Sequence, residues 1–370
     1  MAVRQSAVES MAVSSFADIY RDRRVLVTGH TGFKGTWLTQ WLVRMGARVT
    51  GIALEPETTP AHWTLLSPRI EASHIQDIRD RAAVERLVTG AAPEIVFHMA
   101  AQPLVRRSYR DPEATWATNV MGTLNVLEAV RRTPSVRAAV VVTTDKCYEN
   151  LEMGRAYGED DKLGGHDPYS ASKAGAELVA ASYRQSFFHD GRVLLASARA
   201  GNVIGGGDWS EDRLIPDLVR AAAERRALSI RSPKATRPWQ HVLEPLAGYL
   251  LLGKALLEGR GEAARAWNFG PDDSANRTVD YVLGRMQQYW PDIKWEMTGD
   301  ATLHEAQLLH LNSERARRAL GWAPHWPLDA CLEQTAIWYR AFLQDGTVLT
   351  DAQIDAYVCG AQAQGAAWAA

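Results

Sequence analysis

The chain contains little cysteine, no marked excess of either charge and no long hydrophobic run. Three cysteines stand among 370 residues, at Cys147, Cys331 and Cys359, and their spacing fits neither a disulfide framework nor a metal-binding motif. This usage favours a reducing, cytoplasmic compartment and gives no reason to expect a metal. The formal net charge is −2 without a long basic block, so nucleic acid is not an expected partner. A membrane is not expected either, because no apolar run approaches the roughly 20 residues that cross a bilayer.

The length and the changes of pattern along the chain predict two joined lobes rather than one compact domain. The first residues lack the continuous apolar core of a secretory signal. The last residues are small and low in complexity, so we expect the end after Cys359 to be frayed or weakly docked. The expected organisation is an N-terminal extension (1–20), a dinucleotide-binding domain (21–200, with 238–258 returning to it), a smaller substrate-binding lobe (201–237 and 259–350) and a C-terminal tail (351–370).

The most informative stretch begins at Arg24, where an apolar β-branched run is followed by three glycines and then by large apolar residues at helical spacing. Strand, glycine turn and helix in that order suit a dinucleotide pyrophosphate, because glycines allow close backbone approach and the helix N-terminus offers free N–H groups. A tight loop without a ligand is the alternative, but both flanking elements fit a nucleotide site. The candidate cofactor-binding residues here are Gly29, Thr31, Gly32, Phe33, Lys34 and Gly35.

Candidates for the adenosine end of the cofactor follow the second and third expected strands. Glu55 ends the strand at 48–54, where an acid often binds the ribose, although a solvated loop glutamate is an equal interpretation. No arginine adjoins it to hold a 2′-phosphate, which favours NAD over NADP. Asp77 and Ile78 follow a short third strand, and Asp77, like Asp80, also suits a helix N-cap.

Small and polar residues end the fourth strand. Ala100, Ala101 and Gln102 allow a flat cofactor to approach the backbone closely. The nearby His98 is better explained as a packed side chain than as a catalytic one. Asn119 opens the next helix, and because a buried amide is stable only with partners, we expect it to brace the catalytic strand and helix.

A polar cluster, Thr143 to Lys146, ends the fifth strand, and ligands of doubly wound sheets bind at the carboxyl ends of strands. Tyr169 and Lys173 follow, four residues apart, so they share one helix face. An ammonium beside a phenol favours phenolate, so we expect Tyr169 to lose its proton more easily than a free tyrosine. The pair alone is common by chance, but after a nucleotide loop it predicts catalysis.

Strands and helices alternate as far as a sixth strand, which predicts an α/β fold: a Rossmann-type doubly wound parallel sheet with helices on both faces and a smaller C-terminal lobe. The glycine-rich stretch 200–209 reads as the crossing into that lobe. A capped helix stopped by Gly321 follows later.

The second lobe carries a cluster of cationic and aromatic residues. Arg231, Arg237 and Gln240 beside Trp239 suit a diphosphate and a stacked base, because guanidinium binds phosphate in a bidentate manner. Surface arginines around a structural tryptophan are the alternative.

Together these motifs resemble those of the extended short-chain dehydrogenase/reductases (SDR), and within them the nucleoside-diphosphate-hexose 4,6-dehydratase group. The resemblance covers nearly the whole chain. Asp145-Lys146 after Thr144 is the pattern of the CDP-glucose branch, whereas the dTDP-glucose and GDP-mannose branches carry Asp-Glu. The motifs that carry the resemblance to the 4,6-dehydratase group are residues 29–35, 97–106, 144–148, 169–173, 199–209 and 237–242.

The resemblance implies NAD as cofactor and CDP-glucose as substrate. Tyr169, beside Lys173, would take the proton of the hexose 4-hydroxyl while Thr144 hydrogen-bonds the 4-oxygen. Lys146, when neutral, would remove the C5 proton, and Asp145, when protonated, would give one to the departing 6-hydroxyl. Burial favours both neutral forms and mutual ion pairing opposes them, which leaves the role of Lys146 as the base open.

The resemblance also implies contacts of Thr143 with the cofactor and a place in deoxysugar synthesis for cell-surface polysaccharide such as O-antigen. A sugar-nucleotide 4-epimerase shares the fold, Thr144, Tyr169 and Lys173 but has no use for an acid–base pair at 145 and 146. A non-catalytic NAD-binding sensor has no use for the tyrosine–lysine pair. The implied substrate contacts are Asn202, Arg213, Arg231, Arg237 and Gln240.

A homodimer, or a dimer of dimers, is implied through the helix after Asn119 and the helix that carries Tyr169. The alternative is that the apolar residues of these helices only face the sheet. The candidate interface residues are Leu124, Val126, Leu127, Val130, Leu178 and Val179.

Overall fold

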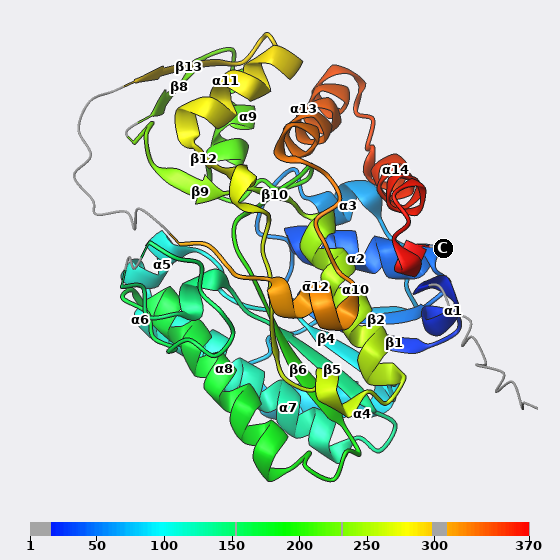
Figure 1. Cartoon of the computed structure of the whole chain (residues 1–370). Helices are drawn as coiled ribbons and strands as arrows, with labels where there is room; N and C mark the ends of the chain where they lie inside the picture. Colours follow the sequence, from blue (N-terminus) through cyan, green and yellow to red (C-terminus); the bar gives the residue numbers. More distant parts are fainter. Residues whose placement is uncertain (1–15, 152–153, 231, 298–308, 370) are drawn as a thin grey trace, which may run out of the picture.

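The computed structural model describes residues 16–151, 154–230, 232–297 and 309–369. A seven-stranded parallel sheet, ordered β11-β6-β5-β4-β1-β2-β3, forms the centre of the molecule (Figure 1). The predicted α/β fold with a doubly wound parallel sheet is therefore confirmed. The strands are β1 (Arg24–Thr28), β2 (Arg48–Ala53), β3 (Ala72–Ile75), β4 (Ile95–His98), β5 (Ala138–Val142), β6 (Leu194–Ala200) and β11 (Ala266–Phe269).

Helices cover both faces of this sheet, and the side chains of each strand alternate between them. Val25 and Val27 of β1 join the core under one set of helices, while Leu26 joins the core under the other. One face carries α4 (Arg81–Ala91), α7 (Thr123–Arg132) and α8 (Pro168–Ser186), and the other carries α1 (Phe16–Tyr20), α2 (Phe33–Arg44) and α10 (Leu243–Leu257).

Short elements lie at the rim of the sheet and at strand ends. They are α3 (His62–Leu66), α5 (Val105–Arg110), α6 (Pro112–Trp116), the π-helical turn η1 (Ala117–Gly122), and the 3-10 turns η2 (Asp145–Cys147), η3 (Gly261–Ala263) and η4 (Asp273–Ala275).

The second lobe lies beyond the carboxyl ends of the strands, at the top of Figure 1. Its short strands pair two by two, as β7–β10, β9–β12 and β8–β13. Its elements are β7 (Val203–Ile204), α9 (Leu214–Ala223), β8 (Ala227–Ile230), β9 (Thr236–Pro238), β10 (Gln240–His241), β12 (Asn276–Thr278), α11 (Val279–Tyr289), β13 (Lys294–Met297) and α13 (Leu328–Asp345).

Part of the stretch 259–350, which the sequence assigned to the second lobe, belongs to the main sheet. Strand β11 pairs in parallel with β6, so that Phe269 lies beside Ala200. Helix α12 (Glu314–Leu320) packs against β11 and α10. The apolar strand completes the sheet edge, and this long-range pairing has no local signal in the sequence.

The C-terminal end is docked, and the expectation that it is frayed is wrong. Helix α14 (Thr350–Ala363) buries Tyr357, and the turn η5 (Ala367–Ala369) buries Trp368. The two rings stack at 6.0 Å, and Tyr357 meets Trp41 of α2 edge-on at 5.8 Å. The small residues that looked featureless are alanine-rich and form helix readily, and one tryptophan anchors them.

One helix end that the sequence marked is present, and the end of the predicted extension is docked. Gly321 ends α12 in the left-handed conformation with a φ of +67°, as predicted. Residues 1–15 of the predicted extension lie outside the described residues, but Tyr20 at the end of α1 is buried and its hydroxyl donates to the carbonyl of Leu250 at 2.7 Å.

Most of the apolar residues expected at a subunit interface are buried inside the chain. Val126, Leu127 and Val130 of α7 are fully buried against the sheet, so assigning them to an interface is wrong. Leu124 and Val179 are partly buried against the same core. The alternative weighed from the sequence, that these residues face the sheet, holds for them.

Exposed apolar side chains nevertheless occur on this side. Leu178 of α8 is 60% exposed, Met121 of η1 51% and Trp116 of α6 42%.

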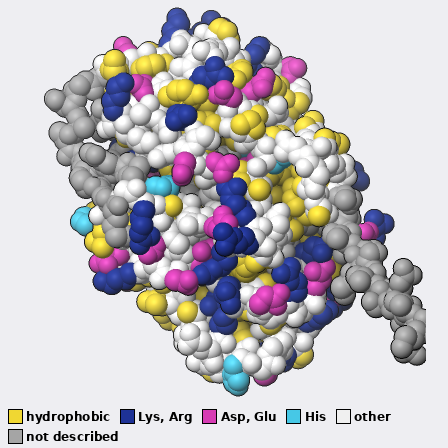
Figure 2. All heavy atoms as spheres, viewed as in Figure 1, with side chains coloured by type: hydrophobic (Ala, Val, Ile, Leu, Met, Phe, Trp, Pro, Cys, Tyr) yellow, Lys and Arg dark blue, Asp and Glu magenta, His cyan; other side chains and the backbone are white. Residues whose placement is uncertain are grey.

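On the face shown in Figure 2, acidic and basic side chains are interspersed. Among the described residues, no helix is both long and apolar enough to span a membrane.

Candidate active site

The loop between β1 and α2 is shaped so that only glycine fits at two positions. Gly29 has a φ of +77°, and a Cβ there would lie 2.8 Å from the backbone nitrogen of Ala100. A Cβ on Gly35 would lie 1.9 Å from the carbonyl oxygen of Gly29. Helix α2 has no side-chain cap at Gly32 and no acid in its first turn, which leaves its N-terminus open to an anion. The loop therefore fits a dinucleotide pyrophosphate.

Hydrogen bonds fix this loop to the ends of the neighbouring strands. The Thr31 hydroxyl donates to the carbonyl of Leu54 beyond β2 at 2.8 Å. The Thr28 hydroxyl oxygen accepts from the backbone nitrogens of Met99 at 3.1 Å and Ala100 at 3.2 Å. The end of β4 is thus held against the glycine loop.

His98 is a packed side chain, as the sequence indicated. Its Nδ1 lies 2.7 Å from the Thr28 hydroxyl and its Nε2 3.0 Å from the Thr123 hydroxyl. Burial lowers the pKa of His98 to about 3, so the ring is neutral and links β1 to α7.

Asn119 ties the end of β4 to the helix that carries the tyrosine–lysine pair. Its Oδ1 accepts from the backbone nitrogen of Gln102 at 2.8 Å, and its Nδ2 donates to the Gln102 carbonyl at 3.1 Å and to the Ser172 hydroxyl at 2.9 Å. Ser172 directly precedes Lys173 in α8. Asn119 thus binds the catalytic helix as expected, but its other partner lies beyond β4 and not in β5, the strand that leads to Thr144. Asn119 lies in a π-helical turn, a form often found at functional sites.

The three adenosine-side candidates differ in exposure. Glu55 is exposed and Ile78 is buried. The Asp77 carboxylate is bound by Arg79 at 2.6 Å, and this hydrogen bond lowers the pKa of Asp77. Asp80, not Asp77, caps α4 by accepting from a backbone N–H of its first turn. Asp77 thus keeps its ionised form, and its contact with a cofactor stays a prediction.

Lys34 connects the glycine loop with the polar cluster at the end of β5. Its Nζ lies 5.9 Å from the ring centroid of Tyr249. Burial, together with the charges of Arg213 and Lys173 and against the charge of Asp145, lowers the pKa of Lys34 to about 7. The amine therefore changes charge near neutral pH.

Thr144 precedes the turn η2, which contains Asp145 and Lys146, at the carboxyl end of β5. The Thr144 hydroxyl donates to Asp145 Oδ1 at 2.9 Å and accepts from the backbone nitrogen of Lys146 at 3.3 Å. Lys146 Nζ lies 3.5 Å from Asp145 Oδ1. The Asp145 side chain is 3% exposed and that of Lys146 30%. This segment therefore presents a buried carboxyl group between a hydroxyl and a more exposed amine.

Tyr169 and Lys173 project from the first two turns of α8, and both are buried. Burial raises the pKa of Tyr169 to about 12, against the hydrogen bond from Thr144 and the charge of Arg213. Lys173 Nζ donates to the carbonyl of Val142 at 3.2 Å, and burial lowers its pKa to about 8. The expectation that Tyr169 loses its proton unusually easily is wrong for this structure, because the cost of burying a phenolate outweighs the nearby positive charges.

The cationic substrate candidates occupy the start of the second lobe. Arg213 at the start of α9 lies 3.0 Å from the buried carboxylate of Asp208. Arg237 donates to the preceding backbone carbonyl at 2.8 Å. Asn202 is half-buried between β6 and β7. Arg231 lies outside the described residues. The charge of Arg213 lowers the pKa of Tyr169, so this arginine acts on the polar cluster.

Trp239 and Gln240 face the interior of the protein. The Trp239 indole is buried and donates to the carbonyl of Arg277 at 3.0 Å, which favours the structural alternative over base stacking. Gln240 Nε2 donates to the carbonyl of Phe269 at 3.0 Å. Its buried Oε1 has no hydrogen-bond partner among the residues that the structure describes, so its contact with substrate stays a prediction.

Sequence reasoning passed over one acid of this region. Glu177 lies one turn beyond Lys173 in α8 and accepts a hydrogen bond from the Thr143 hydroxyl at 2.5 Å. The spacing of four residues between Lys173 and Glu177 indicates that the two side chains share one helix face, and this pattern could have identified Glu177.

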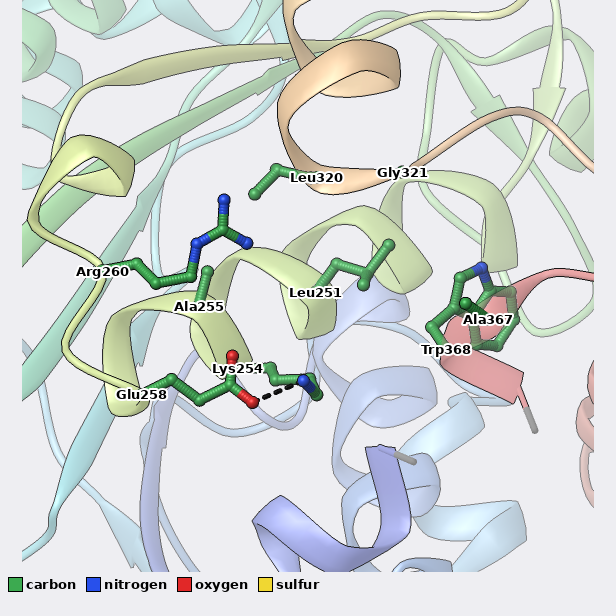
Figure 3. A pocket seen from close by; sticks show the side chains of 9 residues that line it. All are labelled: Leu251, Lys254, Ala255, Glu258, Arg260, Leu320, Gly321, Ala367 and Trp368. Carbon is green, nitrogen blue, oxygen red and sulfur yellow. Dashed lines mark hydrogen bonds and ion pairs between the residues drawn. The ribbon is translucent and has the colours of Figure 1, made fainter. Parts of the chain in front are cut away.

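A cavity of about 170 Å³ lies away from these residues, at the end of α10. Its charged lining is already paired. Lys254 Nζ lies 2.5 Å from Glu258 (Figure 3). Arg260 donates to Glu262 at 2.9 Å. Across the described residues, no group of three or more His, Cys, Asp or Glu side chains is placed to hold a metal ion.

Comparison with known proteins agrees with this arrangement. The chain is 45% identical over 339 residues to the CDP-glucose 4,6-dehydratase of Salmonella typhimurium, which covers 90% of this chain and 94% of the relative. It is 30% identical over 328 residues to a dTDP-glucose 4,6-dehydratase of Streptomyces griseus, covering 85% and 94%.

Solved structures share the fold. DesIV, a dTDP-glucose 4,6-dehydratase from Streptomyces venezuelae solved with NAD and TYD bound, superposes with a TM-score of 0.70 at 25% identity, covering 85% of this chain and 96% of DesIV. The epimerase Mth375 of Methanothermobacter thermautotrophicus superposes with a TM-score of 0.78 at 25% identity, covering 90% and 96%. The family model of the GDP-mannose 4,6 dehydratases matches residues 26–335, from within β1 to within α13, and the chain belongs to this family.

Proposed function

We propose that the protein dehydrates CDP-D-glucose to CDP-4-dehydro-6-deoxy-D-glucose with NAD as its cofactor. The observation that carries the proposal is the buried Asp145 between the Thr144 hydroxyl and the Lys146 amine. A 4-epimerase needs a base for the 4-hydroxyl proton while C4 is oxidised, but it does not need a second acid–base pair for elimination. The 45% identity with the Salmonella typhimurium enzyme supports CDP-glucose as the nucleotide sugar.

The glycine loop and the ends of the neighbouring strands would hold NAD. When bound, NAD would supply a reversible hydride acceptor for C4 and hydride donor for C6 of the hexose, so that the dehydration involves no net oxidation. The residues proposed to bind it are Gly29, Thr31, Gly32, Phe33, Lys34, Gly35, Asp77, Ile78, Ala100, Ala101, Gln102, Asn119, Thr143, Tyr169 and Lys173.

In the first step Tyr169 takes the proton of the 4-hydroxyl, and Thr144 hydrogen-bonds the oxygen as it becomes a ketone. Since burial keeps the proton on Tyr169, that proton must leave before the tyrosine can act as a base. The ammonium of Lys173 is placed on the same helix face to stabilise the phenolate.

In the second step the ketone acidifies the C5–H bond, because the carbanion delocalises into the carbonyl. Lys146 takes this proton, and Asp145 donates one to the 6-hydroxyl, which leaves as water. A proton then returns to C5 as hydride arrives at C6. Lys146 is 30% exposed, so its proton exchanges with solvent between the two events.

Turnover of CDP-glucose in D₂O tests this proposal. Dehydration places deuterium at C5 of the product, which mass spectrometry and NMR detect. A 4-epimerase would yield a C4 epimer without solvent deuterium at C5, and a sensor would yield no product; either result contradicts the proposal. Parallel reactions with dTDP-glucose and GDP-mannose test the choice of nucleotide.

We also propose that two copies pair through α6, η1 and α8, as a homodimer or within a dimer of dimers. The exposed apolar residues Trp116, Met121 and Leu178 on these three elements support it, because burying them on association removes apolar surface from water.

A cytoplasmic location and a role in cell-surface polysaccharide synthesis complete the proposal. Cys147 and Cys331 are buried free thiols, as in a reducing compartment. The second lobe would bind the CDP moiety, with Arg213 and Arg237 on the diphosphate, while Asn202 and Gln240 contact the rest of the substrate.

A further inference from the structure

A buried ion pair lies directly behind the candidate catalytic residues. Glu177 in α8 and Arg199 in β6 approach within 2.9 Å, and their side chains are 3% and 4% exposed. The carboxylate also accepts hydrogen bonds from the hydroxyls of Thr143 at 2.5 Å and Ser197 at 2.7 Å. Three donors, one directly after β5 and two in β6, therefore fix one carboxylate of the helix.

The Glu177 carboxylate is connected both to Lys173 in α8 and to Thr144 after β5. It lies one turn beyond Lys173 on the same face of α8. Its partner Thr143 directly precedes Thr144, whose side chain lowers the pKa of Tyr169 against the larger effect of burial. A shift of Glu177 would therefore move the end of β5 relative to α8.

Arg199 extends the connection to the far end of the turn η2. Its Nη1 donates to the Tyr148 hydroxyl at 2.7 Å and to the carbonyl of Glu159 at 3.0 Å. Tyr148 directly follows η2. The ion pair thus holds the chain immediately before and immediately after the segment that contains Asp145 and Lys146.

Stability alone is a weak explanation for such a pair. Removing two charges from water offsets much of their attraction, and apolar replacements of buried pairs are often neutral. A charge next to a catalytic lysine has a further effect, because it changes the balance between ammonium and amine.

The groups around Lys173 show which negative charge favours its ammonium form. The Glu177 carboxylate raises the pKa of Lys173 against the larger, opposite effect of burial, which brings it to about 8. Cys147 in η2 is a neutral thiol because burial raises its pKa well above the usual value. His98 in β4 is neutral, and Lys34 in α2, with a pKa of about 7, supplies no negative charge. Glu177 therefore supplies the main negative charge at Lys173.

We propose, on the basis of the function proposed above, that Glu177 is a positioning residue for oxidation at C4. It fixes Thr144 through Thr143, and it keeps Lys173 in the ammonium form that stabilises the Tyr169 phenolate.

The test compares Glu177→Gln with Glu177→Asp over a range of pH. Glutamine keeps the size and one oxygen acceptor but removes the charge. Loss of an adjacent opposite charge lowers the pKa of a lysine by about one unit. With a wild-type midpoint of about 8, kcat/KM of Glu177→Gln then falls about twofold at about pH 7 and about eightfold at about pH 8.5. The KM for CDP-glucose stays unchanged because Glu177 is buried behind the strands.

Three controls separate this effect from general damage. Glu177→Asp keeps the charge and should retain the wild-type alkaline limb. Glu128→Gln in α7 removes another buried carboxylate, which is bound by Arg131 at 2.9 Å and by the Tyr183 hydroxyl at 2.7 Å. It should lower the melting temperature without moving the pH profile. The double variant Glu177→Gln/Arg199→Gln avoids an unpaired guanidinium and should show the same shift as the single variant.

A direct titration gives a readout apart from activity. In protein with isotopically labelled lysine side chains, the NMR resonance of Lys173, assigned by its loss in Lys173→Met, should titrate near 8 in the wild type and lower in both glutamine variants. Wild-type titration and an unmoved alkaline limb in folded Glu177 variants would overturn the proposal, as would a pH-independent loss matched by Glu128→Gln. Full activity of Tyr169→Phe would instead refute the proposed active site itself, so the two failures are distinguishable.

Discussion

Replacing Asp145 by asparagine should separate oxidation from dehydration. Asparagine retains an oxygen that accepts the Thr144 hydroxyl, which lies 2.9 Å from Asp145 Oδ1. A Cβ on Gly201 would stand 3.0 Å from Asp145 Oδ2, so the site is tight, and an amide of the same size still fits. The variant therefore loses the proton donor and little else.

The size of the effect follows from the step that needs the acid. Hydroxide is a poor leaving group, and a positioned general acid accelerates such a step by about 10²–10⁴-fold, which corresponds to about 3–5 kcal/mol of barrier. Oxidation at C4 depends on Tyr169, Lys173 and Thr144, so it should keep its rate. The variant should therefore accumulate the 4-ketohexose nucleotide, with part of its nicotinamide reduced.

Stopped-flow absorbance of reduced nicotinamide after mixing with CDP-glucose measures this accumulation, with quenched samples analysed for the keto sugar. The matched control is Asp80→Asn, which keeps the cap of α4 far from the chemistry and should behave as the wild type. Dehydration by Asp145→Asn at the wild-type rate would show that Asp145 is not the acid and would remove the basis for the elimination step.

Four further outcomes are expected. Tyr169→Phe should form no reduced nicotinamide with CDP-glucose, and turnover by this variant would exclude Tyr169 as the base. NAD should bind more tightly below pH 7 than above it, because Lys34, with a pKa of about 7, is a cation only on the acid side; calorimetry across this range should show the dependence disappear in Lys34→Met. Light scattering should report a dimer or tetramer for the wild type and smaller particles for Leu178→Asp, and a monomeric wild type would contradict the proposed pairing. Trp368→Ala should lower the free energy of unfolding by about 3–5 kcal/mol, measured by denaturant titration, and an unchanged value would contradict the docking of the C-terminal end.

Local patterns in the sequence were sufficient for the elements that create the cofactor loop. A β-branched run, three glycines and a helical run specify β1, the loop and α2, because each needs only neighbouring residues. The bracing role of Asn119 was also accessible, since a polar side chain in an apolar helix start requires partners.

The errors concern properties that depend on distant parts of the chain. Trp239 looks like a stacking platform in the sequence, yet it is buried and donates to Arg277, which comes from a later strand. Trp368 ends an apparently featureless tail, yet it stacks on Tyr357. Tyr169 has the lysine that the motif requires, but its pKa is set mainly by burial, which the motif does not encode.

The path of the chain between the two lobes restricts how this enzyme can be re-engineered. The chain leaves the main sheet after β6, comes back as α10 and β11, leaves again for α11 and β13, and returns as α12 before α13. The second lobe is therefore not one continuous segment that could be exchanged as a unit. A chimera with another nucleotide-sugar enzyme would need a junction at every crossing. Each junction would cut the core shared by both lobes, in which Trp37 of α2 donates to the carbonyl of Gly206 at 2.9 Å. Point substitutions on the existing loops are the practical route to a different substrate.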